Sequence, residues 1–418
     1  MHIGVIGSGI AGLTAAKVLS EQHQVTVFEA NDYVGGHTHT VDVDDGVQTL
    51  AVDTGFIVFN EPNYPHLCRL FSELGVESRD SAMSFSVHCE RSGLEWNGSS
   101  LNQVFAQRRN VLRPSHWRML ADIQRFHREA PQALASLYDD VSVCEWTRER
   151  RYGRGFIERY LLPLGASLWS CSALHFGSFP MRFVIEFLHN HQMLQVAARP
   201  VWKTVVGGSG EYVRRLIKPF AHNIRLSTPV TSLRRVQSGV EVRPADGQPI
   251  LFDEVVLACH ADQSLRLLAD ADDVEREVLG AFPYQANEAV LHNDTRLLPD
   301  RRSAWASWNY RIPREQGAEV CVSYNMNLLQ GLASDKVWCL SLNPGDAVDP
   351  EKVVQRLHYD HPLFTAGRAT AQARHDELIR RRGLSFCGAY WGYGFHEDSI
   401  RSALEVCKDF AQECELAA

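Results

Sequence analysis

Apolar side chains near the start of the chain change their spacing twice. Residues 3–6 form a short apolar run, residues 11–20 carry apolar side chains at helical spacing, and residues 25–28 form a second apolar run. A strand, a helix and a second strand in this order are typical of one half of a doubly wound α/β unit. We therefore expect a parallel sheet to begin at the N-terminus.

A different pattern occupies residues 224–258. Short strand-like segments follow one another there, and Gly239 and Gly247 lie in the turns between them. Such spacing predicts an antiparallel meander. Its last strand, residues 255–258, is apolar enough for a central sheet.

The first pattern returns near the C-terminus. Residues 384–390 resemble a strand, and residues 399–414 place apolar side chains at helical spacing. The blocks between these regions are rich in Trp and Phe. We therefore expect an α/β fold in which a Rossmann-type dinucleotide-binding domain with an inserted β-meander is discontinuous, and an α+β substrate-binding domain is built from the insertions. The expected ranges are 1–60, 205–275 and 380–418 for the first domain, and 61–204 and 276–379 for the second.

Composition narrows the class of protein. Hydrophobic residues make up 45% and charged residues 22% of the 418 positions, as in ordinary globular proteins. The net charge of −8 gives the whole chain no electrostatic attraction to nucleic acid. Ten cysteines are scattered without a CxxC pair, which predicts no metal site and fits a reducing, cytoplasmic location. We expect no signal peptide, because the first strand begins at once.

The longest stretch without a formal charge runs from residue 160 to residue 181. Pro163, Gly165 and Pro180 interrupt it, and a membrane-spanning helix needs about 20 mostly apolar residues. We expect buried or interface structure here and no membrane span.

The first turn carries a glycine motif. Gly7, Gly9 and Gly12 form G-x-G-x-x-G between a strand and a helix, and Glu29 ends the second strand. The glycines permit a tight turn, close approach of a pyrophosphate and close packing of the helix, and the carboxylate suits a ribose hydroxyl. This spacing predicts a dinucleotide site.

A second glycine pair, Gly35–Gly36, follows the second strand. An NAD site of this kind usually continues into a helix at this point, whereas a second close backbone approach suits a long, folded cofactor. The pair favours FAD, and the alternative interpretation is a plain turn.

Several motifs together resemble the flavin-containing amine oxidase superfamily. They are VIGSGIAGLTAAKVL, VTVFEA, VGGHT and VDTG near the start, VVGGSGEYVRRL and STPVTSL near the middle, and FCGAYWGYGFHEDSIRSAL near the end. That superfamily includes amine oxidases, protoporphyrinogen oxidase, carotenoid desaturases, UDP-galactopyranose mutase and certain fatty-acid isomerases. The resemblance implies FAD as cofactor, with the N-terminus of the last helix facing the flavin.

The resemblance also assigns cofactor contacts beyond the two glycine motifs. By this likeness the further FAD-binding residues are Ile10, Ala11, Ala30, His37, Thr38, Asp53, Gly55, Val230, Gly388, Glu397, Asp398 and Ser399.

Three departures from the amine-oxidase pattern argue against an amine substrate. His37 replaces the arginine that usually follows the glycine pair, and Asn287 and Glu288 stand where many amine oxidases have a lysine. Phe395 stands at one tyrosine of the amine-oxidase aromatic cage.

Two residues are candidates for catalysis. His396 would lie at the flavin edge, although a histidine bonded to backbone explains it equally well. Glu288 is a weaker candidate base, because a surface residue needs no function. The expected substrate pocket consists of Trp305, Trp308, Tyr310, Tyr390, Trp391 and Phe395, and the alternative for each is plain core packing.

Within this superfamily the chain resembles a bacterial subgroup that shares VDTGFIVFN, SWNY and CGAYWGYGFHED and tends to be encoded beside cyclopropane-fatty-acyl synthase-like methyltransferases. The leading hypothesis is therefore FAD-dependent desaturation of an unsaturated or methylated fatty-acyl chain. The alternatives are a redox-neutral isomerase or mutase, an amine oxidase, and a non-enzymatic lipid-binding relative.

Arginines gather at residues 148–159 and 108–118. They fit peripheral contact with the inner membrane surface, and a solvated helix face is the alternative. The expected partner is an apolar or lipid substrate and not a nucleic acid, while the electron acceptor is not predicted.

Overall fold

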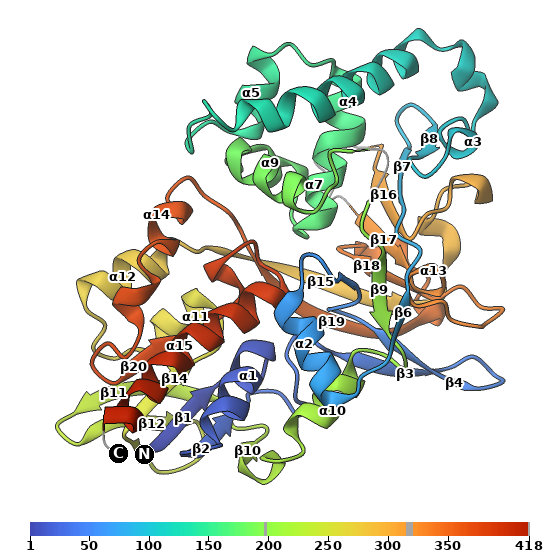
Figure 1. The fold of residues 1–418 in the computed structure, drawn as a ribbon. Helices are drawn as coiled ribbons and strands as arrows, with labels where there is room; N and C mark the ends of the chain where they lie inside the picture. The colour runs from blue at the N-terminus through green and yellow to red at the C-terminus, as the bar shows by residue number, and fades with distance from the viewer. Residues whose placement is uncertain (196–198, 315–320, 417–418) are drawn as a thin grey trace.

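The computed structural model describes residues 1–195, 199–314 and 321–416. Its first sheet has five parallel strands that come from three separated parts of the chain (Figure 1). Their order is β10 (Ile224–Arg225), β2 (Gln24–Phe28), β1 (His2–Ile6), β14 (Glu254–Leu257) and β20 (Leu384–Phe386). The predicted α/β fold with a parallel Rossmann-type sheet is confirmed.

One face of this sheet is covered by helices from distant parts of the sequence. They are α1 (Ile10–Leu19), α2 (Pro65–Leu74), α10 (Gly210–Ile217) and α15 (His396–Leu416). Leu13, Tyr212 and Ala403 are fully buried in the shared apolar cluster, which closes the two ends of the chain onto one another.

The predicted meander covers the other face. Strands β11 (Val230–Val236), β12 (Gly239–Pro244) and β13 (Ile250–Phe252) are antiparallel. The strand that follows, β14, leaves the meander and pairs with β1 and β20, as its apolar sequence predicted. Helices α11 (Ala261–Leu267) and α12 (Asp273–Gly280) pack beside these strands.

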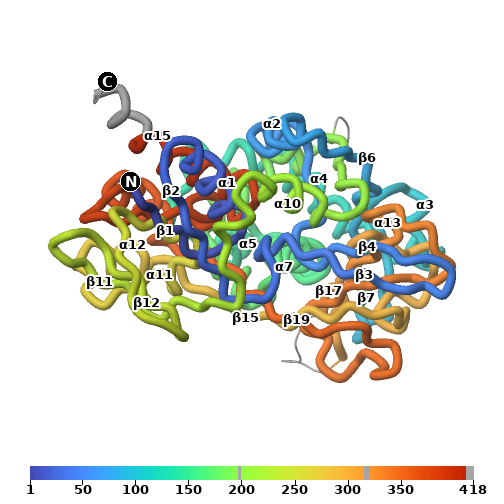
Figure 2. Tube along the Cα trace, turned by 90° about the horizontal axis from the view of Figure 1, so that it is seen from below, coloured from blue at the N-terminus to red at the C-terminus, as the bar shows by residue number. Residues whose placement is uncertain are grey.

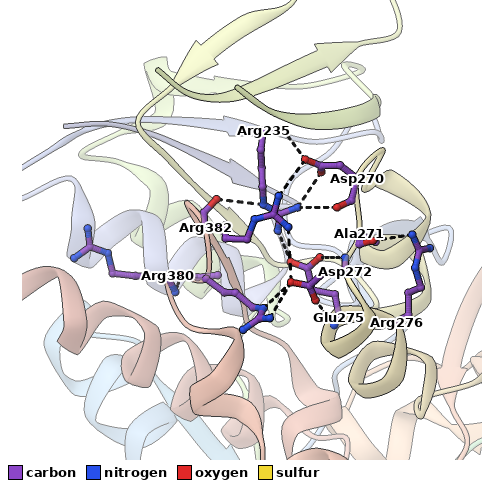
Figure 3. A network of polar contacts seen from close by, with 10 residues as sticks. Arg235, Asp270, Ala271, Asp272, Glu275, Arg276, Arg380 and Arg382 are labelled. Atoms are coloured by element: carbon purple, nitrogen blue, oxygen red, sulfur yellow. Dashed lines mark hydrogen bonds and ion pairs between the residues drawn. The ribbon is translucent and has the colours of Figure 1, made fainter. Parts of the chain in front are cut away.

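A buried ion pair fastens the meander to α12 (Figure 3). Arg235 on β11 donates to the Glu275 carboxylate on α12, and to Asp270 over 2.9 Å. Its Nε donates to the carbonyl oxygen of Arg382, just before β20. Both Arg235 and Glu275 are almost completely buried, so this network joins three segments of the chain.

The second sheet has seven strands. In spatial order they are β19 (Val353–Pro362), β15 (Tyr284–His292), β18 (Cys339–Leu342), β17 (Cys321–Asn325), β16 (Trp308–Ile312), β7 (Phe85–Cys89) and β8 (Leu94–Asn97). Strands β15 and β19 are the longest, and Figures 1 and 2 show them between the two halves of the molecule.

Helices form a lobe above the seven-stranded sheet (Figure 1). They are α3 (Leu101–Val104), α4 (Pro114–Ala133), α5 (Val143–Glu149), α6 (Arg154–Phe156), a π-helical turn (Ile157–Leu161), α7 (Leu162–Leu168), α8 (Ala173–Gly177) and α9 (Met181–Asn190). The stretch from residue 160 to residue 181 lies in this lobe, and Phe176 and Phe179 in it are fully buried. Among the described residues, no helix is both long and apolar enough to cross a membrane.

Shorter elements complete the structure. Strands β3 (Thr40–Asp44) and β4 (Thr49–Asp53) form a hairpin, and β9 (Trp202–Val205) lies between β5 (Phe59–Asn60) and β6 (Ser78–Asp80). Helix α13 (Met326–Gln330) follows β17, and α14 (Arg368–Gln372) follows β19. The described cysteines, from Cys68 to Cys407, are free thiols.

One expected domain range differs from the packing. Helix α2 falls within residues 61–204, the range expected for the substrate-binding domain, but its Leu67 and Phe71 are buried in the same cluster as α1 and α15. The aromatic composition of residues 61–204 did not reveal that α2 belongs to the first domain, because composition does not show that its apolar side chains pack against α1 and α15.

Candidate functional site

A cavity of about 750 Å³ lies where the parallel sheet meets the seven-stranded sheet. This volume is within the usual range for small-molecule sites. Of the residues expected to bind FAD, thirteen line its wall. They are Gly7, Gly9, Ile10, Ala11, Glu29, Ala30, Gly35, Gly36, His37, Gly55, Val230, Gly388 and Ser399. The folding of the chain thus brings these positions together, and their contact with FAD stays a prediction.

The glycine turn has room for a phosphate group at one position only. A Cβ atom added at Gly12 would lie 2.0 Å from the carbonyl oxygen of Gly7, so this glycine permits helix packing. A Cβ added at Gly9 would meet nothing within 4 Å. The backbone at Gly9 therefore faces the open cavity beside the N-terminus of α1, as a pyrophosphate requires.

Glu29 is fixed at the same turn. One carboxylate oxygen accepts from the backbone N–H and the hydroxyl of Ser8, at 2.9 and 2.6 Å, and the other accepts from two nitrogens of Asn31, both at 2.9 Å. The carboxylate is held rigidly at the cavity wall, where a ribose hydroxyl can reach it.

The second glycine pair packs against the first turn. Gly35 donates its N–H to the Ser8 carbonyl oxygen over 3.1 Å, and a Cβ at Gly36 would lie 3.2 Å from the Cα of Gly9. Gly36 also has a positive φ of 58°. This close approach is more than a plain turn needs, and it fits the expected long cofactor.

Histidines line the middle of the cavity. His37 lies with its ring 5.4 Å from that of His361 and 5.8 Å from that of His260, measured between ring centres. Enclosure by protein lowers the pKa of His37 to about 4 and that of His361 to about 3, and the neighbouring histidines contribute in the same direction. His37 is therefore uncharged near neutral pH, unlike the arginine that it replaces.

His396 lines the same cavity from the first residue of α15. Its ring stacks on Phe56 with 3.8 Å between ring centres, and its Nε2 lies 3.0 Å from the hydroxyl oxygen of Thr38. That hydroxyl also contacts the Tyr212 hydroxyl. Enclosure and the nearby His37 lower the pKa of His396 to about 3, so the ring is neutral and anchored to a side chain rather than to backbone. Thr38 does not line the cavity and acts through this contact.

The acidic residues at the start of α15 accept hydrogen bonds from the protein backbone and do not line the cavity. Asp398 accepts from the backbone N–H groups of Tyr393 and Phe395 at 3.0 and 3.1 Å, and so caps its own helix. Glu397 accepts from the backbone N–H groups of His66 and Leu67 at 3.0 and 3.1 Å, and so caps α2. Neither lines the cavity. Their contact with FAD stays a prediction, and Ser399 is the residue of this turn that lines the wall.

Asp53 is likewise structural. It is fully buried, and its Oδ1 accepts from the Thr40 hydroxyl at 2.6 Å and from the N–H and hydroxyl of Ser209 at 2.8 Å each. Burial raises its pKa to about 6, against the opposing effect of these hydrogen bonds. Asp53 holds Ser209, which follows Gly207–Gly208 after β9, and lies outside the cavity wall, so its contact with FAD stays a prediction.

Glu288 lies outside the cavity as well. Its carboxylate accepts from Arg356 over 2.7 Å across the β15–β19 pair, so the hypothesis that it is a base is not carried forward. Its neighbour Asn287 instead donates to Nδ1 of His361 over 2.9 Å and orients that ring at the cavity wall.

The expected aromatic pocket divides in two. Trp308, Tyr390 and Phe395 line the cavity, whereas Trp305, Tyr310 and Trp391 do not. The indole of Trp305 donates to the Pro299 carbonyl oxygen, Tyr310 is buried in the core of the seven-stranded sheet, and Trp391 stacks on His375. Trp308 and Tyr310 are two residues apart and so lie on the same face of β16; what separates them is their position along the strand, since Trp308 is its first residue and lines the cavity.

Sequence reasoning missed a whole wall of the pocket. Its further members are Ile57, Val58, Tyr64, Met83, Ser167, Leu168, Trp169, Ser170, Phe187, Trp202, Tyr324, Leu340 and Leu342. Trp169 and Phe187 pack with 4.9 Å between ring centres, and Phe187 stacks on Phe395 at 5.0 Å. The aromatic composition of residues 61–204 was the available signal, but it gives no direction for individual side chains. We call these residues, with Trp308 and Phe395, the apolar pocket.

Comparison with known proteins agrees with this geometry. The sequence model of the family described as flavin containing amine oxidoreductase matches residues 10–290. Amine oxidase [flavin-containing] B of Cavia porcellus is 27% identical over 254 residues, which are 57% of this chain and 46% of that protein. The chain spans about half the length of the curated relatives it matches.

Solved structures share the fold over nearly the whole chain. Putrescine oxidase bound to putrescine has a TM-score of 0.69 at 15% identity and covers 99% of both chains. The fatty acid isomerase from P. acnes that produces CLA has a TM-score of 0.67 at 15% identity and covers 98% of both chains. At such identity these likenesses concern the fold alone.

Proposed function

The chain belongs to the flavin-containing amine oxidoreductase family, whose flavin is FAD, and from this premise we propose that it desaturates an apolar substrate, an unsaturated or methylated fatty-acyl chain. One observation carries the proposal. The apolar pocket contains no charged side chain, and no lysine lines any part of the cavity among the described residues.

Bound FAD supplies the two-electron acceptor for a hydride. The chain's own residues provide the binding surface: the backbone at Gly9 and the N-terminus of α1 face the position for the diphosphate, and Glu29 faces the position for the ribose. The apolar pocket excludes water and holds a hydrocarbon chain beside the N-terminus of α15.

The charged residues of the lining support an uncharged substrate. They are Glu29, Arg266 and Asp360. Glu29 is engaged by Ser8 and Asn31, and Arg266 pairs with Asp262 over 2.6 Å. Asp360 lies on β19 next to His361 and is not one of the residues of the apolar pocket. An alkylammonium group held among the residues of the apolar pocket would therefore lack an anionic partner there, and an unpaired buried cation is costly.

Desaturation is a balanced two-hydrogen oxidation. One carbon of the acyl chain loses a hydride to the flavin, the neighbouring carbon loses a proton, and a double bond forms between them. The proton ends on solvent water near neutral pH, because pKa values of about 3 make the imidazoles of His361 and His396 at the cavity wall too weakly basic to keep it. Either ring can act only as a relay for this proton.

Anaerobic reduction of the bound flavin tests the proposal. The FAD-loaded full chain is mixed without oxygen with fatty-acyl phospholipids or methylated fatty acids, and in parallel with fatty amines of equal length. We expect loss of the 450 nm absorbance with the acyl lipids, and a product two mass units lighter. Bleaching by the amines but not by the lipids would overturn the proposal in favour of an amine oxidase.

Two tryptophans provide matched variants. Trp308→Ala opens the apolar pocket, whereas Trp305→Ala removes a tryptophan that lies outside the cavity wall. We expect the first to lower kcat/KM for acyl lipids about tenfold or more and the second to leave it within about twofold, since one lost aromatic contact corresponds to roughly 1.4 kcal/mol or more. Equal effects of the two variants would mean that the apolar pocket does not bind the acyl chain.

A redox-neutral isomerase is the second candidate, because the same uncharged pocket suits an acyl chain whose double bond only moves. It predicts multiple turnovers without oxygen and a product of unchanged mass. A non-enzymatic lipid-binding role is disfavoured by the open backbone at Gly9 and the fixed carboxylate of Glu29, and a protein purified without flavin that fails to take up FAD would restore it.

A further inference from the structure

A second cavity, of about 710 Å³, opens on the helical lobe and has a different chemistry. Four arginines line it: Arg91 after β7, Arg118 on α4, Arg154 on α6 and Arg159 in the π-helical turn. We call it the arginine cavity. Its floor is apolar, with Met119, Phe156 and Ile312, and it lies apart from the FAD cavity, with which it shares no lining residue.

Most of its positive charge is uncompensated. Arg154 pairs with Glu158 over 2.7 Å, but within the described parts of the chain Arg91, Arg118 and Arg159 have no carboxylate within 4.0 Å. The other lining acid, Asp122, is engaged by the backbone N–H of Gly153 at 2.9 Å and by Arg125 at 3.8 Å. Three arginines without a described carboxylate within 4.0 Å therefore line one hollow, and the two carboxylates of its lining, Glu158 and Asp122, already have partners.

The wider surroundings have the same sign. Residues 101–160 contain eleven arginines against seven acidic residues, although the whole chain has a net charge of −8. Charge of opposite sign is thus separated within the molecule. Residues 101–160 belong to the helical lobe, which Figure 1 shows away from α1 and α15.

Exposed apolar side chains occur on the turn before α4 and on α4 itself, the helix whose Arg118 and Met119 line the arginine cavity. Val111, Leu112 and Trp117 are 46%, 86% and 50% exposed, and Trp117 directly precedes Arg118. The indole nitrogen of Trp117 donates to the Val111 carbonyl oxygen over 2.8 Å and so ties Trp117 to the turn that carries Val111 and Leu112; we call these three residues the ridge. Arg109 in the same turn donates to the carbonyl oxygen of Gly93, which follows the cavity-lining residue Ser92.

We propose that the arginine cavity binds the phosphate group of an anionic phospholipid and seats this corner of the helical lobe on a membrane surface. Guanidinium groups bind phosphate oxygens in pairs, and aromatic and aliphatic side chains enter the interfacial layer of a bilayer. A soluble phosphate ester would explain the arginines alone, but it leaves the exposed ridge of Leu112 and Trp117 without a role. The proposal rests on these residues and is independent of the reaction at the flavin site.

Co-sedimentation of the FAD-loaded full chain with vesicles tests it. We compare vesicles of phosphatidylcholine with vesicles containing about 30% phosphatidylglycerol. We expect binding to the anionic vesicles only, and a decrease as salt is raised, because screening weakens charge attraction at the surface.

The decisive variant is Arg118→Gln/Arg159→Gln. Each basic residue near an anionic surface contributes about fivefold to partitioning, so the double variant should bind about 25-fold more weakly. The matched control, Arg234→Gln/Arg243→Gln, removes two exposed arginines of the meander and should retain wild-type binding. Trp117→Gln, which keeps the charge, should weaken binding at high salt more than at low salt.

Several results would overturn the proposal. They are equal binding to neutral vesicles, equal loss in the control and the arginine variants, tighter binding to single-stranded RNA than to vesicles, and saturable binding of inorganic phosphate or glycerophosphate without any vesicle binding. The last would assign the cavity to a soluble phosphate ester. Flavin absorbance and melting temperature are measured for every variant, so that a misfolded variant is replaced by Arg91→Gln, which lies at the exposed rim.

Discussion

The Nε2 atom of His396 lies 3.0 Å from the hydroxyl oxygen of Thr38, although the two residues are 358 positions apart. Thr38 follows the second glycine pair, and His396 begins the last helix. This contact therefore joins the two segments that meet around the expected flavin position, and it keeps a neutral imidazole at the cavity wall.

The stability of the protein should depend on pH through His396. The imidazole takes up a proton near pH 6.5 in the unfolded chain, but only near pH 3 in the folded chain. Between these values the unfolded chain holds more protons, so the free energy of unfolding falls as the pH falls, by at most about 1.4 kcal/mol per pH unit for one site. His396→Gln should reduce the slope between pH 7 and pH 5, as measured by urea unfolding at constant free FAD.

Phe56→Leu is the control for this prediction. It weakens the packing on His396 but removes no titrating group, so it should lower the free energy of unfolding by a similar amount at every pH. Parallel slopes for wild type and His396→Gln would show that this histidine is not the titrating site.

The two glycines of the first turn should respond in opposite ways to alanine. Gly12→Ala places a Cβ 2.0 Å from the Gly7 carbonyl oxygen. It should therefore lower the free energy of unfolding by about 3 kcal/mol or more, at the upper end of the cost of overpacking, even without flavin. Gly9→Ala meets no protein atom within 4 Å and keeps a φ of −66°, so the flavin-free protein should melt as wild type does.

The added methyl group at Gly9 instead enters the space expected for the diphosphate. We expect at least tenfold weaker FAD binding, read from the ratio of absorbance at 450 and 280 nm after equilibrium dialysis. Normal FAD content in the Gly9→Ala protein would mean that the diphosphate lies elsewhere.

The cofactor-binding part of the site could be predicted from the sequence because backbone atoms, rather than side chains, form much of it. The spacing of Gly7, Gly9 and Gly12 after an apolar run depends on local geometry alone, so the residues themselves carry the signal. The strand at residues 255–258 was predictable for a similar reason, since its unbroken apolar run needs a sheet buried on both faces.

Side-chain direction was not predictable in the same way. Glu397 and Asp398 stand at the expected helix start, but only the fold decides that one caps α2 and the other caps α15. Trp308 and Trp305 are equally aromatic, and their different exposure to the cavity depends on where β16 begins. Contacts between distant segments, such as that of Glu397 with His66, leave no local pattern.

Glu397 should stabilise the junction between α15 and α2. Its carboxylate accepts two backbone N–H groups at the start of α2, and Gln would turn an N–H toward one of them. We expect Glu397→Gln to lower the free energy of unfolding by about 1–3 kcal/mol, the usual cost of an unsatisfied buried group. Amide hydrogen exchange in α2 should also become faster.

Glu405→Gln is the matched change on the same helix. Glu405 pairs with Lys408 at the surface over 2.7 Å, and such pairs contribute about 0–1 kcal/mol. If the two variants lose equal stability, or if α2 exchanges at the wild-type rate in Glu397→Gln, the capping role is wrong.

The Arg235–Glu275 pair should be the most sensitive polar contact of the meander (Figure 3). Glu275→Gln leaves a buried guanidinium whose one remaining charged partner among the described residues is Asp270, and breaking a buried pair costs about 3–5 kcal/mol. Glu277→Gln, two residues along the same helix, removes a partner of Arg374 that is 71% exposed, so it should cost less than about 1 kcal/mol.

Replacing both members of the pair separates charge from packing. Arg235→Met combined with Glu275→Leu leaves no unpaired buried charge at these two positions, and apolar replacements of buried pairs are often close to neutral. We expect the double variant to recover much of the stability lost in Glu275→Gln, but not all, because Asp270 and the Arg382 carbonyl oxygen lose their donor. Urea unfolding of wild type, Arg235→Met, Glu275→Leu and the double variant gives the coupling energy directly. A double variant no more stable than Glu275→Gln would mean that the side chains are held by packing and not by their charges.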